Sequence, residues 1–137
     1  MAKIIIIDDD AQMRRMVGRI LTGAGHDVRE AENGCDGLAA IRAQKPDLVI
    51  TDVLMPEKDG IETILELRAA DGKIPILVFS GGGQISNQAM FLDMAKKFGA
   101  SASLEKPFRA AELLETVARL LSPRPSVAAS YGGAAAN

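Results

Sequence analysis

Apolar residues gather in short uninterrupted runs that alternate with segments of helical periodicity. The runs Ile4–Ile7, Leu48–Thr51 and Pro75–Phe79 are rich in aliphatic and β-branched side chains, which is typical of strands buried on both faces. Weaker strands are expected over Asp27–Glu32 and Ala100–Leu104. The pattern therefore predicts five strands, three of them central in a sheet.

Between the strands, apolar residues recur at spacings of three and four, which predicts five amphipathic helices. The first begins after Asp10, a good N-cap, and presents Met13, Met16, Val17, Ile20 and Leu21 on one side. The others are expected over residues 35–43, from residue 61 to near Gly72, over 90–98 and over 113–121.

Strands alternating with helical crossovers imply an α/β fold with a parallel, doubly wound sheet. A (βα)5 chain of this length suits the flavodoxin-like strand order 2-1-3-4-5. We expect one domain over residues 1–121. From Ser122 the composition changes to Pro, Ser, Ala and Gly, so residues 122–137 are expected to be a disordered tail.

Composition narrows the possible functions without naming one. The chain has 137 residues, of which 47% are hydrophobic, and its formal net charge of -2 does not favour nucleic acid as a partner. Cys35 is the only cysteine, which excludes a disulfide framework; we expect it to be a packed thiol on the second helix. The run Ile4–Ile7 is too short for membrane insertion, so a cytoplasmic protein is expected.

Candidate chemistry collects where the predicted strands end. Asp8 and Asp9 follow the first strand, Asp52 ends the third, Ser80 follows the fourth and Lys106 follows the fifth. In parallel sheets of this kind, ligands bind beyond the carboxyl ends of the strands at the switch point of the strand order. These five residues are therefore expected to share one site.

Three close carboxylates repel one another unless a cation is present, and hard oxygen ligands favour Mg²⁺ as that cation. An aspartate beside a divalent ion can act as a nucleophile and form an acyl phosphate. In such a site Asp52 would accept the phosphoryl group, Lys106 would balance its charge, and the Ser80 hydroxyl would donate a hydrogen bond to it.

From Lys3 to Leu121 the chain resembles the response-regulator receiver domains of two-component signalling, including the CheY-like single-domain proteins. The motifs that carry the resemblance are Asp8-Asp9, the run Asp52–Pro56 followed by Asp59-Gly60, Ser80, and Lys106-Pro107-Phe108. Together, at these spacings, these motifs are highly specific for that family.

The resemblance implies that a sensor histidine kinase or a histidine phosphotransfer protein phosphorylates Asp52. It also implies Mg²⁺ held by Asp9, Asp52 and the main-chain carbonyl of Leu54, with Asp8 acting through water, and a cis bond between Lys106 and Pro107. Such a protein is not a conventional enzyme, although it assists its own phosphoryl transfer and dephosphorylation. We expect a monomer or a weak phosphorylation-dependent dimer.

The sequence departs from the family at the positions that transmit the signal. Ser103 occupies the place of the usual aromatic switch residue, three positions before the lysine, and three consecutive glycines lengthen the loop after Ser80. Gly81, Gly82, Ser103 and Pro107 are thus the candidate switch residues. The expected output is contact with a downstream protein through helix 4, strand 5 and helix 5, from a stand-alone receiver.

Two other functions stay open. One is a receiver-like binding module that works without phosphorylation, which the absent aromatic favours and the complete set of acids disfavours. The other is a phosphatase of the haloacid dehalogenase type, with Asp8–Asp10 as its D-x-D motif, although Gln12 and the lack of a cap domain disfavour it. Arg14 and Arg15 are expected on a solvated face, with kinase docking as an alternative.

Overall fold

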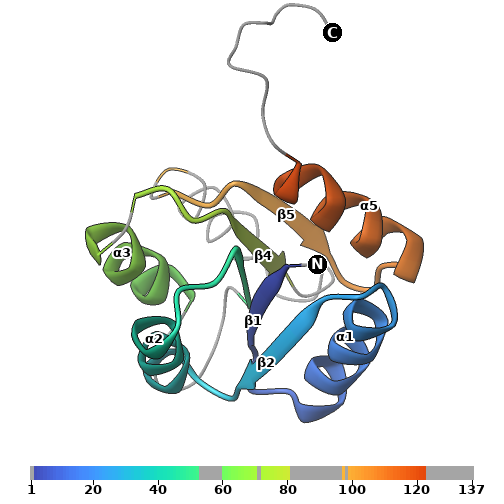
Figure 1. The fold of residues 1–137 in the computed structure, drawn as a ribbon, viewed down its shortest axis with the longest axis horizontal. Helices are drawn as coiled ribbons and strands as arrows, with labels where there is room; N and C mark the ends of the chain where they lie inside the picture. The colour runs from blue at the N-terminus through green and yellow to red at the C-terminus, as the bar shows by residue number, and fades with distance from the viewer. Residues whose placement is uncertain (1, 53–59, 71, 81–96, 98, 123–137) are drawn as a thin grey trace, which may run out of the picture.

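The computed structural model describes residues 2–52, 60–70, 72–80, 97 and 99–122. Its centre is a five-stranded parallel sheet in the order β2-β1-β3-β4-β5 (Figure 1). The predicted fold class and strand order are confirmed. The strands are β1 (Lys3–Ile7), β2 (Asp27–Ala31), β3 (Leu48–Asp52), β4 (Ile76–Ser80) and β5 (Ala102–Glu105).

Four helices lie in the described part of the chain, and each agrees with a predicted helix to within a few residues. They are α1 (Ala11–Gly23), α2 (Gly34–Ala43), α3 (Gly60–Ala70) and α5 (Ala110–Leu121). The predicted helix over 90–98, the glycine loop after Ser80 and the predicted tail beyond Ser122 fall outside the described residues.

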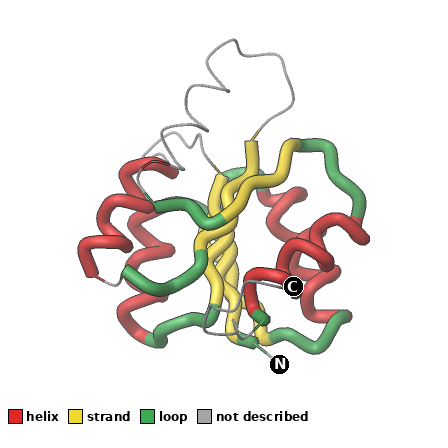
Figure 2. The backbone as a smooth tube through the Cα atoms, turned by 90° about the horizontal axis from the view of Figure 1, so that it is seen from above, coloured by secondary structure: helices red, strands yellow, loops and turns green. Residues whose placement is uncertain are grey.

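The sheet separates two layers of helices, and each of its faces has its own apolar cluster (Figure 2). Successive side chains of a strand point to opposite faces, so Ile4 and Ile6 pack with α1 and α5, whereas Ile5 and Ile7 pack with α2 and α3. This double burial explains why β1, β3 and β4 are continuous apolar runs.

Caps fix where the helices leave the sheet. The Asp10 carboxylate accepts hydrogen bonds from the main-chain N–H groups of Gln12 and Met13, as its predicted N-cap role requires. The Asn33 side chain caps α2 by accepting from the N–H of Asp36. Because α1 begins directly after the loop that leaves β1, its cap also fixes the acidic residues of that loop.

Several strand boundaries differ from the prediction by one or two residues. β4 includes Ser80, which the sequence pattern placed just after the strand, and β5 begins at Ala102 rather than Ala100. Ser80 lies opposite Glu105 in the ladder, and the N–H of Lys106 donates to the Ser80 carbonyl oxygen at 2.8 Å. This pairing extends β4 and brings the segment containing Lys106 to the end of the strand.

Candidate functional site

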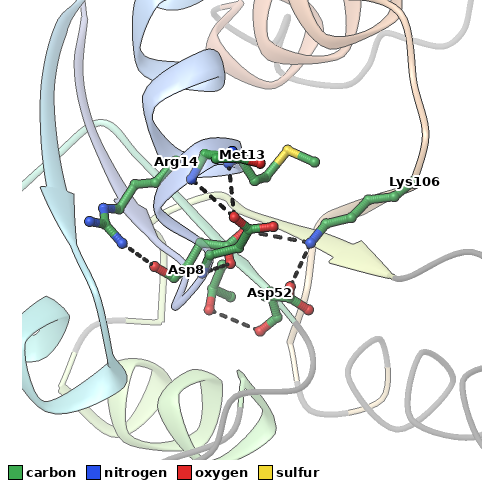
Figure 3. A network of polar contacts seen from close by, with 8 residues as sticks. Asp8, Met13, Arg14, Asp52 and Lys106 are labelled. Carbon is green, nitrogen blue, oxygen red and sulfur yellow. Dashed lines mark hydrogen bonds and ion pairs between the residues drawn. The ribbon is translucent and has the colours of Figure 1, made fainter.

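The predicted acids meet at the carboxyl ends of β1 and β3 (Figure 3). Asp8, Asp9 and Asp52 each offer one carboxylate oxygen, and these three atoms lie within 4.8 Å of one another. Asp8 and Asp52 are buried, with 0% and 9% of their surface exposed, whereas Asp9 is exposed. The site therefore has a buried floor and an open side.

Lys106 reaches across the sheet edge to the same carboxylates. Its Nζ donates a hydrogen bond to Asp52 Oδ2 at 2.7 Å and lies 3.5 Å from Asp8 Oδ2. Burial lowers the pKa of Lys106, but the hydrogen bond and charge of Asp52, together with the charge of Asp8, outweigh burial and raise the pKa above its ordinary value. The amine is thus fully protonated at neutral pH.

The segment after β5 is anchored on both sides of the lysine. The Lys106 N–H binds the Ser80 carbonyl, and the Phe108 ring packs against Phe79 with a centroid separation of 4.8 Å. The bond between Lys106 and Pro107 is cis, as the resemblance predicts.

Asp8 is a buried acid of the site that is held by a main-chain hydrogen bond. Its Oδ1 accepts a hydrogen bond from the Asp10 N–H at 2.9 Å, whereas the buried Oδ2 accepts none from the described residues. Burial raises the pKa of Asp8 to about 6, an effect that the Asp10 hydrogen bond and Lys106 only partly offset. A buried carboxylate oxygen without a hydrogen-bond donor is suited to be a ligand of a cation.

The residues present fit Mg²⁺. The donor set consists of hard carboxylate oxygens, one of them on a carboxylate with an unsatisfied buried oxygen, and the open side leaves room for water ligands. Soft ligands that would favour zinc or copper are absent from this cluster of described residues.

Comparison with known proteins agrees with this geometry. The model of the family described as the response regulator receiver domain matches residues 4–118. The chain belongs to this family. It is 39% identical over 121 residues to the chemotaxis protein CheY of Bacillus subtilis, a match that covers 88% of this chain and 98% of CheY.

Longer relatives contain a similar receiver. The chain is 36% identical over 119 residues to the response regulator MprA of Mycolicibacterium vanbaalenii, which covers 87% of this chain and 50% of MprA. The crystal structure of NtrX from Brucella abortus in complex with ADP superposes with a TM-score of 0.82 at 32% identity, covering 88% of this chain and 27% of NtrX. The chain thus spans half of MprA and about a quarter of NtrX.

The remaining predicted residues of the receiver take different places. Ser80 is buried at the carboxyl end of β4, on the same sheet edge as the acids. Ser103 lies on β5 opposite Val78 and is half-buried, and Pro107 is exposed. Leu54, Gly81 and Gly82 lie outside the described residues.

Two sequence interpretations need correction. Cys35 is exposed rather than packed, because it occupies the outer side of α2 while Leu38 and Ile41 face the sheet. Arg14 is not on a solvated face, since only 14% of its side chain is exposed and its Nη1 donates to the Asp8 carbonyl oxygen at 2.7 Å. Arg15 is exposed, as expected.

The contact between Arg14 and the Asp8 carbonyl was not predicted from the sequence. A signal was present: Arg14 lies four residues after the N-cap Asp10, and helical side chains point back toward the N-terminus of their helix. A long side chain at that position covers the loop before α1.

In the described part of the receiver, no helix is long and apolar enough to cross a membrane.

Proposed function

We propose that this receiver accepts a phosphoryl group on Asp52 in a Mg²⁺-dependent reaction, with a phosphohistidine of a histidine kinase or phosphotransfer protein as donor. The observation that carries the proposal is the position of the Asp52 carboxylate, which lies beside Asp8 and Asp9 and 2.7 Å from the Lys106 Nζ. Family membership supports the donor class, because receiver domains interact with histidine kinases and with downstream targets.

In the proposed phosphoryl transfer, an O–P bond to Asp52 forms as the P–N bond of the donor breaks. A carboxylate oxygen of Asp52 attacks phosphorus, the P–N bond to the donor imidazole breaks, and the imidazole nitrogen keeps the electron pair and is then protonated. The product is an acyl phosphate, a known form of covalent catalysis by aspartate. Bound Mg²⁺ would neutralise charge on the phosphoryl oxygens.

The chain's own residues prepare this reaction. Asp8, Asp9 and Asp52 would hold the metal ion, with the main-chain carbonyl of Leu54 as a further proposed ligand. The Lys106 ammonium, which now pairs with the Asp52 carboxylate, would pair with a phosphoryl oxygen once Asp52 is phosphorylated. The Ser80 hydroxyl, at the neighbouring strand end, would donate a hydrogen bond to another phosphoryl oxygen.

We also propose that the signal leaves through a protein contact rather than through turnover of a substrate, so that the protein is not a conventional enzyme. The proposed output face comprises β5, α5 and the segment before β5, with Gly81, Gly82, Ser103 and Pro107 as switch residues. The position of Ser103 on an edge strand beside the site supports this proposal.

The test is phosphorylation by a small donor. The full chain is incubated with acetyl phosphate and Mg²⁺, and the bound phosphoryl group is measured by intact mass. We expect one phosphoryl group on the wild type, none on Asp52→Asn, and full labelling of Asp27→Asn. Asp27 is a matched control because it is exposed and lies opposite Lys3 at the other end of the strands.

Other outcomes identify the alternatives. Release of inorganic phosphate with no labelled protein, abolished by Asp52→Asn, would replace the proposal with an aspartate-nucleophile phosphatase. No label and no turnover, with Mg²⁺ and donor in excess, would replace it with a binding module that works without phosphorylation.

A further inference from the structure

Arg14 lies on the first full turn of α1, and its side chain extends back toward the acidic loop (Figure 3). The other two arginines of this helix, Arg15 and Arg19, are exposed, whereas Arg14 is mostly covered. A guanidinium has several donors in a fixed planar arrangement, so a partly buried arginine requires acceptors on more than one side.

Two acceptors from different elements hold this guanidinium. Nη1 donates to the main-chain carbonyl oxygen of Asp8 at 2.7 Å, and Nε donates to Glu30 Oε1 on β2 at 3.1 Å. Glu30 is 39% exposed, so this ion pair by itself is worth little in stability. Its geometric effect is to fix the direction of the arginine that binds the Asp8 carbonyl.

The Asp8 carbonyl belongs to the peptide unit that leads into Asp9. Because a peptide unit is planar, the direction of its C=O also fixes the direction of the following N–H and of the Asp9 Cα. The neighbouring bonds are fixed as well, because the Asp8 N–H donates to the Ala31 carbonyl and the Asp10 N–H donates to Asp8 Oδ1.

The Asp9 carboxylate depends on this peptide for its position. Asp9 is exposed, and no hydrogen bond from the described residues holds its carboxylate, yet one of its oxygens lies within 4.8 Å of an oxygen of Asp8 and of Asp52. The backbone of the loop is therefore what places this ligand. Among the described residues, Arg14 supplies the side-chain contact to the Asp8–Asp9 peptide.

We propose that Arg14 is a positioning residue for the metal site, which holds the Asp8–Asp9 peptide so that the Asp9 carboxylate faces the other ligands, with Glu30 fixing Arg14. This inference rests on the proposed function, since it assumes that the acid cluster binds Mg²⁺. Residues that orient metal ligands without touching the metal typically contribute about 10- to 100-fold to metal affinity.

Whether the loss of Arg14 weakens or strengthens Mg²⁺ binding shows whether Arg14 acts by positioning the loop or through its charge. Arg14 is a cation close to a cation site, so its charge alone repels Mg²⁺, and removing that charge would tighten binding. Removing a positioning contact would weaken binding. Arg14→Gln tests both at once, and Arg15→Gln is the matched control, because it removes the same charge from the adjacent position on α1 without a contact to the loop.

The experiment measures Mg²⁺ dissociation constants of the full chain by isothermal titration calorimetry at constant ionic strength, together with thermal unfolding. We expect the Mg²⁺ dissociation constant of Arg14→Gln to rise about 10-fold, and that of Arg15→Gln to stay equal or fall slightly. Glu30→Gln should weaken binding less than Arg14→Gln, and the double variant should be no weaker than Arg14→Gln alone. Arg14→Lys, which can still reach one acceptor, should recover part of the affinity.

A readout on the metal-free protein accompanies the titration. Amide hydrogen exchange at Asp10, whose N–H donates to Asp8 Oδ1, should be faster in Arg14→Gln and in Glu30→Gln than in the wild type or Arg15→Gln. If Arg14→Gln does not fold, Glu30→Gln and Arg14→Lys carry the same test.

Opposite results overturn the inference in distinguishable ways. If the wild type binds Mg²⁺ and Arg14→Gln binds it equally or more tightly, as Arg15→Gln does, Arg14 is not a positioning residue. A lower unfolding temperature with an unchanged dissociation constant would assign Arg14 a purely structural role. If the wild type itself binds no Mg²⁺, the proposed function fails first, and this inference fails with it.

Discussion

Asp8 shows how a single residue can destabilise the fold and still be useful at the site. Its side chain is 1% exposed, its Oδ2 has no donor among the described residues, and burial raises its pKa to about 6. In the unfolded chain the pKa returns to about 3.8. The unfolded state therefore binds fewer protons than the folded state between these two values, and this difference lowers the free energy of unfolding as the pH rises.

The pH dependence gives a prediction for Asp8→Asn. The cost of ionising Asp8 is absent below about pH 4 and complete above about pH 6, and at neutral pH it amounts to about 3 kcal/mol. Asparagine keeps the Oδ1 acceptor but loses the attraction to Lys106. In chelator, Asp8→Asn should therefore raise the free energy of unfolding at pH 7.5 by about 1–2 kcal/mol, and change it little at pH 4.

Urea unfolding at pH 4 and pH 7.5 measures the difference in the free energy of unfolding between Asp8→Asn and the wild type. The other carboxylates titrate in both proteins, so their contribution cancels in this difference. Asp27→Asn is the control for loss of an exposed carboxylate. A difference between Asp8→Asn and the wild type that is the same at pH 4 and pH 7.5 would show that ionisation of Asp8 is not its source.

At the scale of elements, close packing of α2 on β1 imposes a size limit at one position. Gly37 lies in the middle of α2, where glycine is unfavourable by about 1 kcal/mol relative to alanine. A Cβ built at this position would overlap Cδ1 and Cγ1 of the fully buried Ile7, directly before the site. The fit of α2 against the end of β1 thus outweighs helix propensity.

Gly37→Ala should therefore destabilise the protein, although alanine is the better helix former. Overpacking costs about 1–3 kcal/mol and exceeds the propensity gain, so we expect a net loss of about 1 kcal/mol. Gly23→Ala is the matched control, since Gly23 ends α1 and its added Cβ would meet no atom within 4 Å. It should leave stability unchanged or slightly higher, as measured by urea unfolding.

A double variant identifies the contact. Adding Ile7→Val removes Cδ1, one of the atoms that the new methyl would overlap, so part of the loss in Gly37→Ala should be recovered non-additively. Equal stability of Gly37→Ala and the wild type would mean that α2 shifts away from β1 at little cost.

The same elements show why the sequence predicts some features and misses others. The ends of parallel strands meet at one edge, so Asp8, Asp52 and Lys106 could be grouped without coordinates. The interior strands were clear because both of their faces are buried. Edge strand β5 is half-exposed and has no long apolar run, and its first residue was misplaced by two positions.

The burial of side chains on helices was harder to predict, because it depends on what packs against the helix. Arg14 is covered because Glu30 and the Asp8 carbonyl surround it, and both belong to segments that only the folded sheet brings close. Cys35 is exposed because α2 turns its other side to the sheet. Charge and polarity along the chain do not determine either result.

For the whole molecule, the two apolar clusters stabilise the fold, whereas the acidic site at the sheet edge lowers its stability. Asp8 and Asp52 are held close together with one amine between them, whereas in the unfolded chain they separate and are solvated. A cation that binds only the folded arrangement must therefore raise the free energy of unfolding of the entire domain, and the rise follows from its free concentration and its dissociation constant.

Mg²⁺ should accordingly stabilise the protein against urea by about 2.7 kcal/mol at a concentration one hundred times its dissociation constant, with an unchanged denaturant slope. Because bound Mg²⁺ keeps Asp8 ionised, it should also reduce the loss of stability that the metal-free protein shows between pH 4 and pH 6. Asp9→Asn should retain the fold, since Asp9 is exposed, but need more Mg²⁺ for the same gain, since Asp9 is a proposed ligand of the ion. An equal gain with sodium chloride at matched ionic strength would instead assign the effect to screening of the acidic edge.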